Sequence, residues 1–182
     1  MGGNPILNFI LGLALVVGGV IAAYVMYNSG NTSATASNTA SYINMMISNT
    51  QNDFANNPGN FAGFNNTAAI EAGIPPTTWV PTGQKTSIVD PWGGAVTFAV
   101  ASVNGGTNNG YTMTLANVPA NVCAQIATIY TQQTASISIA GKAVASNPSY
   151  GGTATTWPPV PATVDAACSS DTNTIVWTQS GQ

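Results

Sequence analysis

The sequence contains no histidine and no arginine, and Lys85 and Lys142 are its only basic residues. Only 4% of its 182 residues are charged, compared with about 25% in a typical globular protein, and the net charge is -3. Without a basic patch the chain cannot neutralise a phosphate backbone, so we expect no direct nucleic-acid binding. A surface with so little charge repels its neighbours weakly. This favours a subunit that packs densely, although an extracellular or acid-adapted protein has a similar composition.

The same shortage of ionisable groups argues against an enzyme. One glutamate and four aspartates remain for acid–base chemistry, and no histidine is present. Asp165 and Asp171 flank Cys168, but their turn-rich surroundings favour solvated side chains over a catalytic pair. Two cysteines without histidine or CxxC spacing cannot form a closed zinc site. We therefore predict no enzymatic activity, no metal and no cofactor.

Cys123 and Cys168 are the only cysteines. An even pair in a chain with the marks of an exported protein favours one disulfide that closes a long loop. The alternative is two buried free thiols.

A long apolar stretch, Ile6–Tyr27, contains no charged residue, and Asn8 is the polar residue near its start. As a helix it would extend roughly 33 Å, enough to cross a bilayer, and it is longer than the roughly 7 to 15 residues of a secretory h-region. We predict a retained transmembrane helix. Its small residues allow close approach of other helices, although they also occur in ordinary membrane anchors. The candidate packing positions are Asn8, Gly12, Ala14, Gly18, Gly19 and Ala22.

The next segment, Asn28–Asn52, has no proline, and Ala36, Ala40, Ile43 and Ile47 recur at helical spacing. We predict that the helix continues here with one apolar face. Residues 53–89 are rich in proline, glycine and asparagine, which indicates an ordered loop region containing a short helix at 67–72.

The rest of the chain predicts an antiparallel sheet. Alternating β-branched and aromatic residues flank the turn signal NGGTNNG, so the two strands should form a hairpin. Ahead of them, DPWGG has the composition of a turn before the first strand: Asp90, Pro91, Trp92, Gly93 and Gly94. The predicted elements are strands at 95–103, 110–115, 136–140 and 173–179, a helix at 119–131 and a helical turn at 164–168.

Four tryptophans lie in this region. Trp92 and Trp177 sit at strand edges, where core packing is favoured. Trp79 and Trp157 lie in proline-rich loops, where aromatic residues often mark surface contacts. We predict subunit contacts for these two, and ligand binding is the alternative.

In order and spacing, the long helix, DPWGG, the strand GYTMTL, the helix with Cys123 and the segment AACSSDTNTIVW resemble type IV pilins of the type IVb group, which includes bundlin and conjugative thin-pilus subunits. The resemblance implies an α+β fold: a long N-terminal helix, with a membrane or filament-core half and an amphipathic half, packed on an antiparallel sheet, with a C-terminal disulfide-bounded D-region. The implied parts are a core half (1–28), an amphipathic half (29–52) and a head (53–182). Within the head they are the αβ-loop (53–89), the hairpin and helix start (90–122), the D-region (123–168) and the last strand and tail (169–182).

The resemblance also implies a function. The chain would be the major subunit of a pilus used for cell contact, adhesion or conjugation. Its partners would be other copies of itself, the inner membrane before assembly, a prepilin peptidase and the assembly machinery, and its final place would be the bacterial surface. Type IV pilins usually carry glutamate at the fifth mature position, where this chain has Pro5, or Asn8 if cleavage follows Gly3. We expect Met1 to be the mature N-terminus. A pseudopilin of a type II secretion system and a membrane-anchored monomeric binding domain are the alternatives.

Overall fold

The computed structural model describes residues 32–54, 60–152 and 156–181. Contacts divide the chain into two compact units, Met1–Thr35 and Ala36–Gln182, and all the named strands belong to the second. The predicted core half (1–28) and its packing positions lie outside the described residues. Within the described part of the chain, no helix combines the length and the hydropathy needed to cross a membrane. The predicted division into two helix halves and a head, and the division of the head into four parts, stay predictions.

The first described element is a helix over residues 32–53. Its buried positions recur every three or four residues, so they form one face. They are Ala36, Thr39, Ile43, Met46, Ile47 and Thr50. The predicted amphipathic helix is therefore confirmed over the described residues. The high serine and threonine content gives this segment a poor intrinsic helix propensity, and the buried face supplies the stability that propensity does not.

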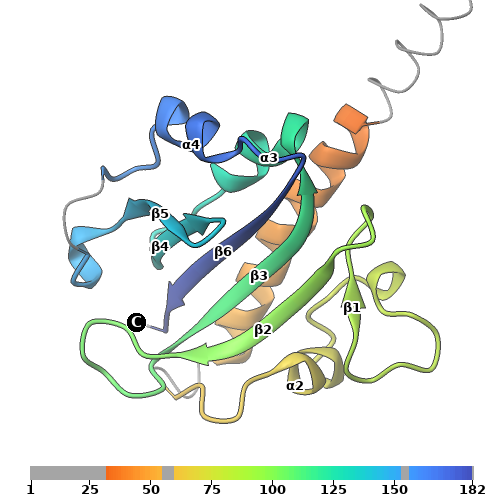
Figure 1. Ribbon diagram of the computed structural model, residues 1–182. Coiled ribbons are helices and arrows are strands. Elements are labelled where there is room, and N and C mark those ends of the chain that lie inside the picture. Colours follow the sequence, from red (N-terminus) through yellow and green to blue (C-terminus); the bar gives the residue numbers. More distant parts are fainter. Residues whose placement is uncertain (1–31, 55–59, 153–155, 182) are drawn as a thin grey trace, which may run out of the picture. The chain divides into compact units, whose positions relative to one another are not determined.

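The helix covers one face of a six-stranded antiparallel sheet (Figure 1). The strands lie in the order β1-β2-β3-β6-β4-β5, so β6, the last in the chain, lies between β3 and β4. Their bounds are β1 Ile88–Val89, β2 Ala95–Ala101, β3 Gly110–Pro119, β4 Thr134–Ile139, β5 Lys142–Ser146 and β6 Thr172–Ser180. The predicted hairpin is confirmed as β2 paired with β3, with Val96 opposite Leu115.

The core lies between this helix and the sheet. Successive residues of a strand alternate between the two faces of the sheet, and in β2, β3 and β6 the buried apolar residues follow this alternation. Trp177 of β6, Tyr111 of β3 and Ile137 of β4 are fully buried there with Ile43 of the helix. The predicted α+β fold, with a helix packed on an antiparallel sheet, is confirmed.

Short helices complete the head. They are α2 Asn66–Glu71, the 3-10 helix η1 Thr77–Trp79, α3 Ala120–Ala127, the 3-10 helix η2 Pro148–Tyr150 and α4 Pro161–Ala167. The Asn65 side chain caps α2 by accepting a hydrogen bond from the backbone N–H of Ala68 at 3.1 Å. The helix predicted at 119–131 ends at Ala127, because β-branched and aromatic residues follow.

Strand β5 is not predicted from the sequence. Its sequence, KAVAS, contains alanine at alternate positions and a single β-branched residue, so it carries little strand signal. It forms because β4 offers it an edge for pairing, with Ile139 opposite Lys142.

Candidate functional site

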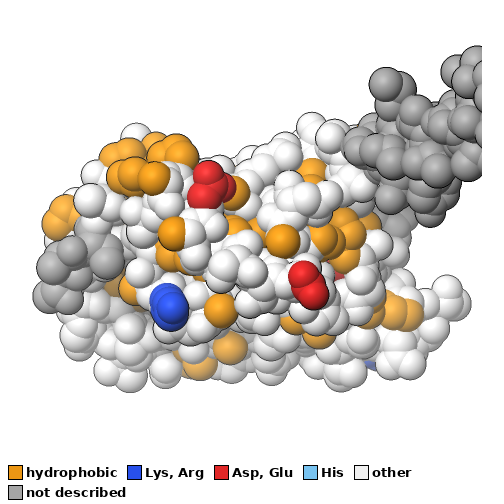
Figure 2. Space-filling model, turned by 45° about the horizontal axis from the view of Figure 1, so that its top comes forward, with side chains coloured by type: hydrophobic (Ala, Val, Ile, Leu, Met, Phe, Trp, Pro, Cys, Tyr) orange, Lys and Arg blue, Asp and Glu red, His pale blue; other side chains and the backbone are white. Residues whose placement is uncertain are grey.

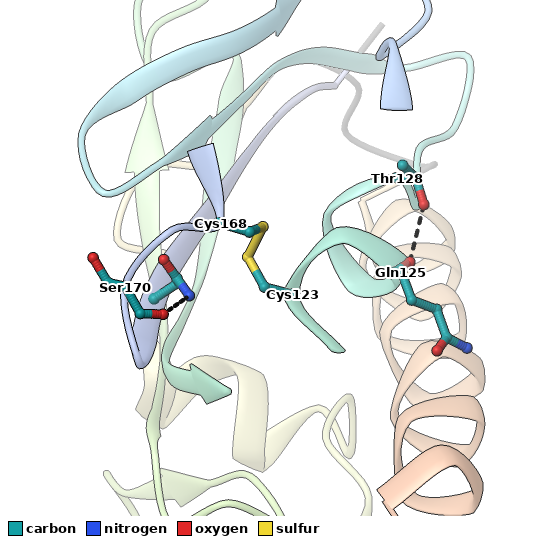
Figure 3. The surroundings of a disulfide bond; sticks show 6 residues. Cys123, Gln125, Thr128, Cys168 and Ser170 are labelled. Carbon is teal, nitrogen blue, oxygen red and sulfur yellow. Dashed lines mark hydrogen bonds between the residues drawn. A yellow bond between two sulfur atoms is a disulfide. The ribbon is translucent and has the colours of Figure 1, made fainter. Parts of the chain in front are cut away.

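The two cysteines form a disulfide, as predicted, and the alternative of free thiols is wrong. Cys123 comes from α3 and Cys168 from the residue that ends α4, with their Cα atoms 5.8 Å apart (Figure 3). Both side chains are buried. The bridge therefore joins the two helices at the boundaries of the segment that contains β4, β5 and α4.

The chain turns into β6 beside the bridge. The side-chain Nδ2 atom of Asn173 donates to the carbonyl oxygen of Ser170 at 2.8 Å (Figure 3), and the backbone N–H of Ala120 donates to the carbonyl oxygen of Asp171 at 3.2 Å. The first bond lies within the turn that leads into β6, and the second connects the start of α3 to this turn. Asp165 and Asp171 are exposed, which agrees with the solvated reading of both carboxylates. Within the described residues, no group of three potential ligands could hold a metal ion.

The DPWGG turn is built around the carboxyl group of Asp90. Its Oδ1 atom accepts hydrogen bonds from the backbone N–H groups of Trp92 at 2.9 Å and Gly94 at 2.8 Å. The turn was predicted to precede the first strand, but β1 comes before it, so it closes the β1–β2 hairpin instead. The strand had been missed because two residues, Ile88 and Val89, are too short a run to show alternation.

Asp90 is also buried, which its place in a turn did not predict. Its side chain is 4% exposed, and its Oδ2 atom has no hydrogen-bond partner. Burial raises the pKa of the Asp90 carboxyl above its ordinary value of 3.8, and the hydrogen bonds from Gly94 and Trp92 lower it by a smaller amount. The folded state therefore favours the protonated carboxyl more than the unfolded state does.

This raised pKa predicts that the head gains stability in mild acid. The free energy of unfolding should rise as the pH falls from neutral through the raised pKa of Asp90 and level off below about 3.8, because the folded state then binds the extra proton. The other four carboxyl residues are exposed. In Asp90→Asn, urea unfolding measured at a series of pH values from neutral down to about 3.8 should no longer show this rise. An unchanged rise in the variant would assign it to another group.

The four tryptophans differ in how deeply they are buried. Trp177 is fully buried, and its Nε1 atom donates to the carbonyl oxygen of Ile129 at 2.8 Å, so the predicted core role is confirmed. Trp92 is half-buried against the core. Trp157 is also half-buried and packs edge-on against Tyr130, with the ring centres 5.1 Å apart. Its role as a subunit contact stays a prediction.

The predicted surface contact at Trp79 is wrong. Trp79 is only 3% exposed, and its ring packs edge-on against Tyr42 of the long helix at 5.6 Å. The proline-rich sequence indicated an exposed loop. Instead, the loop folds into η1, where the backbone N–H of Trp79 donates to the carbonyl oxygen of Pro76. Local composition predicts the turn, but it does not predict that the long helix packs against Trp79.

A buried polar cluster beneath β4 and β6 was not singled out from the sequence. The side chain of Gln179 bonds with the hydroxyl groups of Thr134 and Thr131 at 3.0 to 3.2 Å. The burial of Gln179 was predictable from the strand pattern. Gln179 follows Ile175 and Trp177 at a spacing of two residues, so all three side chains lie on the inner face of β6. Buried polar groups need such partners.

Charged groups are sparse over the visible surface. In Figure 2 the acidic and basic side chains lie singly among apolar and neutral polar ones. This face therefore offers few charged groups for binding a partner.

Two comparisons match this chain. A family model described as "PilS N terminal" matches residues 33–180. The crystal structure of the type IVb pilin from Salmonella typhi is similar, with a TM-score of 0.53 and 20% identity, covering 76% of this chain and 95% of that chain. At this identity the likeness concerns the fold. No curated protein gave a match.

Proposed function

The chain belongs to the PilS N-terminal family of type IV pilins, and from this premise we propose that it is the major subunit of a type IVb-like pilus. Pilins are structural subunits, not enzymes. In the proposed life cycle, a prepilin peptidase and the assembly machinery act on the chain at the inner membrane. Copies then polymerise through their N-terminal helices into an extracellular filament used for cell contact, adhesion or conjugation.

The observation that carries the proposal is the uncovered face of the long helix. One face is buried on the head, while the other is exposed and carries no charge from residue 36 to residue 52. Its exposed positions include Ser37, Ser41, Asn44, Met45 and Ser48. Because these side chains are neutral, another helix can pack on them without the cost of burying a charge, and the three serines among them are small enough to allow close approach. Such a face suits packing against helices of neighbouring copies.

Electron microscopy of sheared cell-surface material tests the proposal. Filaments of uniform diameter that contain this chain are expected. A chain that remains in the membrane, with no filaments, would favour the membrane-anchored binding domain. Short filaments that form only when the chain is overproduced would favour the pseudopilin.

The apolar stretch supplies a sharper prediction. Gly18→Leu should reduce the number of filaments at least tenfold while the amount of chain in the membrane stays the same, because a bulky side chain prevents close helix approach at a small-residue position. Immunoblotting of membranes and filament counts by microscopy measure the two quantities.

Val17→Leu is the matched control, since it exchanges one large apolar residue for another beside the same position. It should leave filaments in place. Normal filament numbers in Gly18→Leu would remove the packing role from this residue.

A further inference from the structure

A polar groove of about 250 Å³ lies at the end of the sheet where β2 turns into β3 and β5 ends. In Figure 1 the β2–β3 loop and the segment after β5 lie at this same end. The groove has no charged lining residue. Its polar lining side chains are Ser102, Asn104, Ser136, Ser146, Tyr150 and Thr178.

The floor of the groove is a row of hydroxyl groups on three neighbouring strands. Ser136 of β4 is the register partner of both Thr178 of β6 and Ser146 of β5. Their neighbours Ile137 and Trp177 point into the core, so alternation sends the hydroxyl groups to the opposite face, away from the long helix. Adjacent strands lie about 4.8 Å apart, a spacing comparable with that between hydroxyl groups across a sugar ring.

The walls of the groove are two loops held in fixed conformations. Asn109 bonds both the N–H and the C=O of Val103, at 2.7 and 2.9 Å, which fixes the β2–β3 loop. Asn104 follows with a φ of 49°, and Gly151 ends η2 with a φ of 76°. A Cβ atom on Gly151 would lie 2.6 Å from Oδ1 of Asn104, so the two loops are in contact. The groove is therefore formed before any ligand arrives.

We propose that this groove binds one neutral sugar residue. Hydroxyl and amide groups both donate and accept hydrogen bonds, as the hydroxyl groups of a sugar require, and the aromatic ring of Tyr150 offers a surface for its C–H face. The absence of charge in the lining disfavours phosphorylated or acidic sugars. The volume is below the roughly 300 to 1,000 Å³ of pockets for drug-sized ligands, which suits a single ring.

This inference goes beyond the structural role and does not depend on it. The groove is formed by one chain, so sugar binding and filament formation can succeed or fail separately. Sugar binding would make the chain specific for surfaces that display neutral sugars.

Saturation-transfer NMR on the full chain tests the proposal, with the protein held in a detergent that has no sugar headgroup. The probes are the methyl glycosides of glucose, galactose, mannose and N-acetylglucosamine, with sialic acid as the charged comparison. At least one neutral glycoside should bind with a Kd of about 1 mM, and sialic acid should bind at least tenfold more weakly. No binding of any neutral glycoside at about 10 mM would overturn the proposal.

Variants then locate the binding. The double variant Ser136→Ala with Ser146→Ala should weaken the affinity about tenfold, because two hydrogen-bonding groups of the floor are lost. Ser138→Ala is the matched control: it lies on the same face of the same strand but does not line the groove. Equal losses in both proteins, or no loss in the double variant, would overturn the assignment to this groove.

Substitutions at Tyr150 test the proposal without changing the hydroxyl groups on the floor of the groove. Tyr150→Phe should keep the affinity within about twofold, while Tyr150→Ala should lower it about fivefold, since only the second change removes the ring. Equal affinity in both variants would contradict the stacking contact. A high-mannose glycoprotein and a neutral lipopolysaccharide core, tested on the same samples, distinguish the carriers of such sugars.

Discussion

Replacing Cys123 and Cys168 together by serine is expected to lower the free energy of unfolding by about 4 kcal/mol. The bridge closes 45 residues, and in the chain-entropy model a loop of this length restricts the unfolded chain by that amount. Urea unfolding of the full chain in mild detergent, followed by tryptophan fluorescence, measures the loss. In cells the same variant should show less steady-state protein and no piliation, because a loss of this size is a large part of the stability of a single domain.

The bridge also makes a local prediction. Hydrogen exchange should accelerate first in β4, β5 and α4, the elements that lie between the cysteines in the chain. Wild-type protein treated with reductant is the control, and it should behave as the double variant does. Unchanged stability and piliation in the double variant would show that the bridge is dispensable.

Gly94→Ala is the second substitution with a large expected effect. A Cβ atom at this position would collide with the carbonyl oxygen of Ala116 and would lie 2.8 Å from Oδ2 of Asp90. Ala116 lies at the irregularity in β3 between Leu115 and Val118. Because backbone must move to make room, we expect a loss of about 3 kcal/mol in the free energy of unfolding.

Gly93→Ala is the matched control in the same turn. Gly93 has a φ of 77°, and nothing lies within 4 Å of its Cβ position, so alanine there brings backbone strain without a collision. The expected loss is only about 1 to 2 kcal/mol. If the two variants were equally stable, the close approach of Ala116 would not be what requires glycine at position 94.

Elements with a clear period were predictable. The long helix and strands β2, β3 and β6 each bury one face, so their apolar residues recur at the spacing of a helix or a strand. β5 lacked this signal because alanine fits strands and helices alike and because its pairing depends on β4. β5 forms because it pairs with β4 in the sheet, and its five residues alone do not predict a strand.

The candidate site was less predictable for a related reason. The sequence showed that Asp90 and Trp79 lie in turns, but a turn can face solvent or another element. Asp90 is buried beneath its own turn, and Trp79 is buried against Tyr42, which precedes it by 37 positions in the sequence. The row of hydroxyl groups on β4, β5 and β6 likewise becomes visible only when the strand register is known.

The strand order has a consequence for how the head folds. β6 follows the other five strands in the chain, yet it lies between β3 on one side and β4 on the other. Until β6 has formed, no strand connects the β1–β2–β3 meander with the β4–β5 hairpin. A chain truncated before Thr172 therefore lacks the strand that joins the two pieces, and we expect both to be cut by proteases more readily than in the full head.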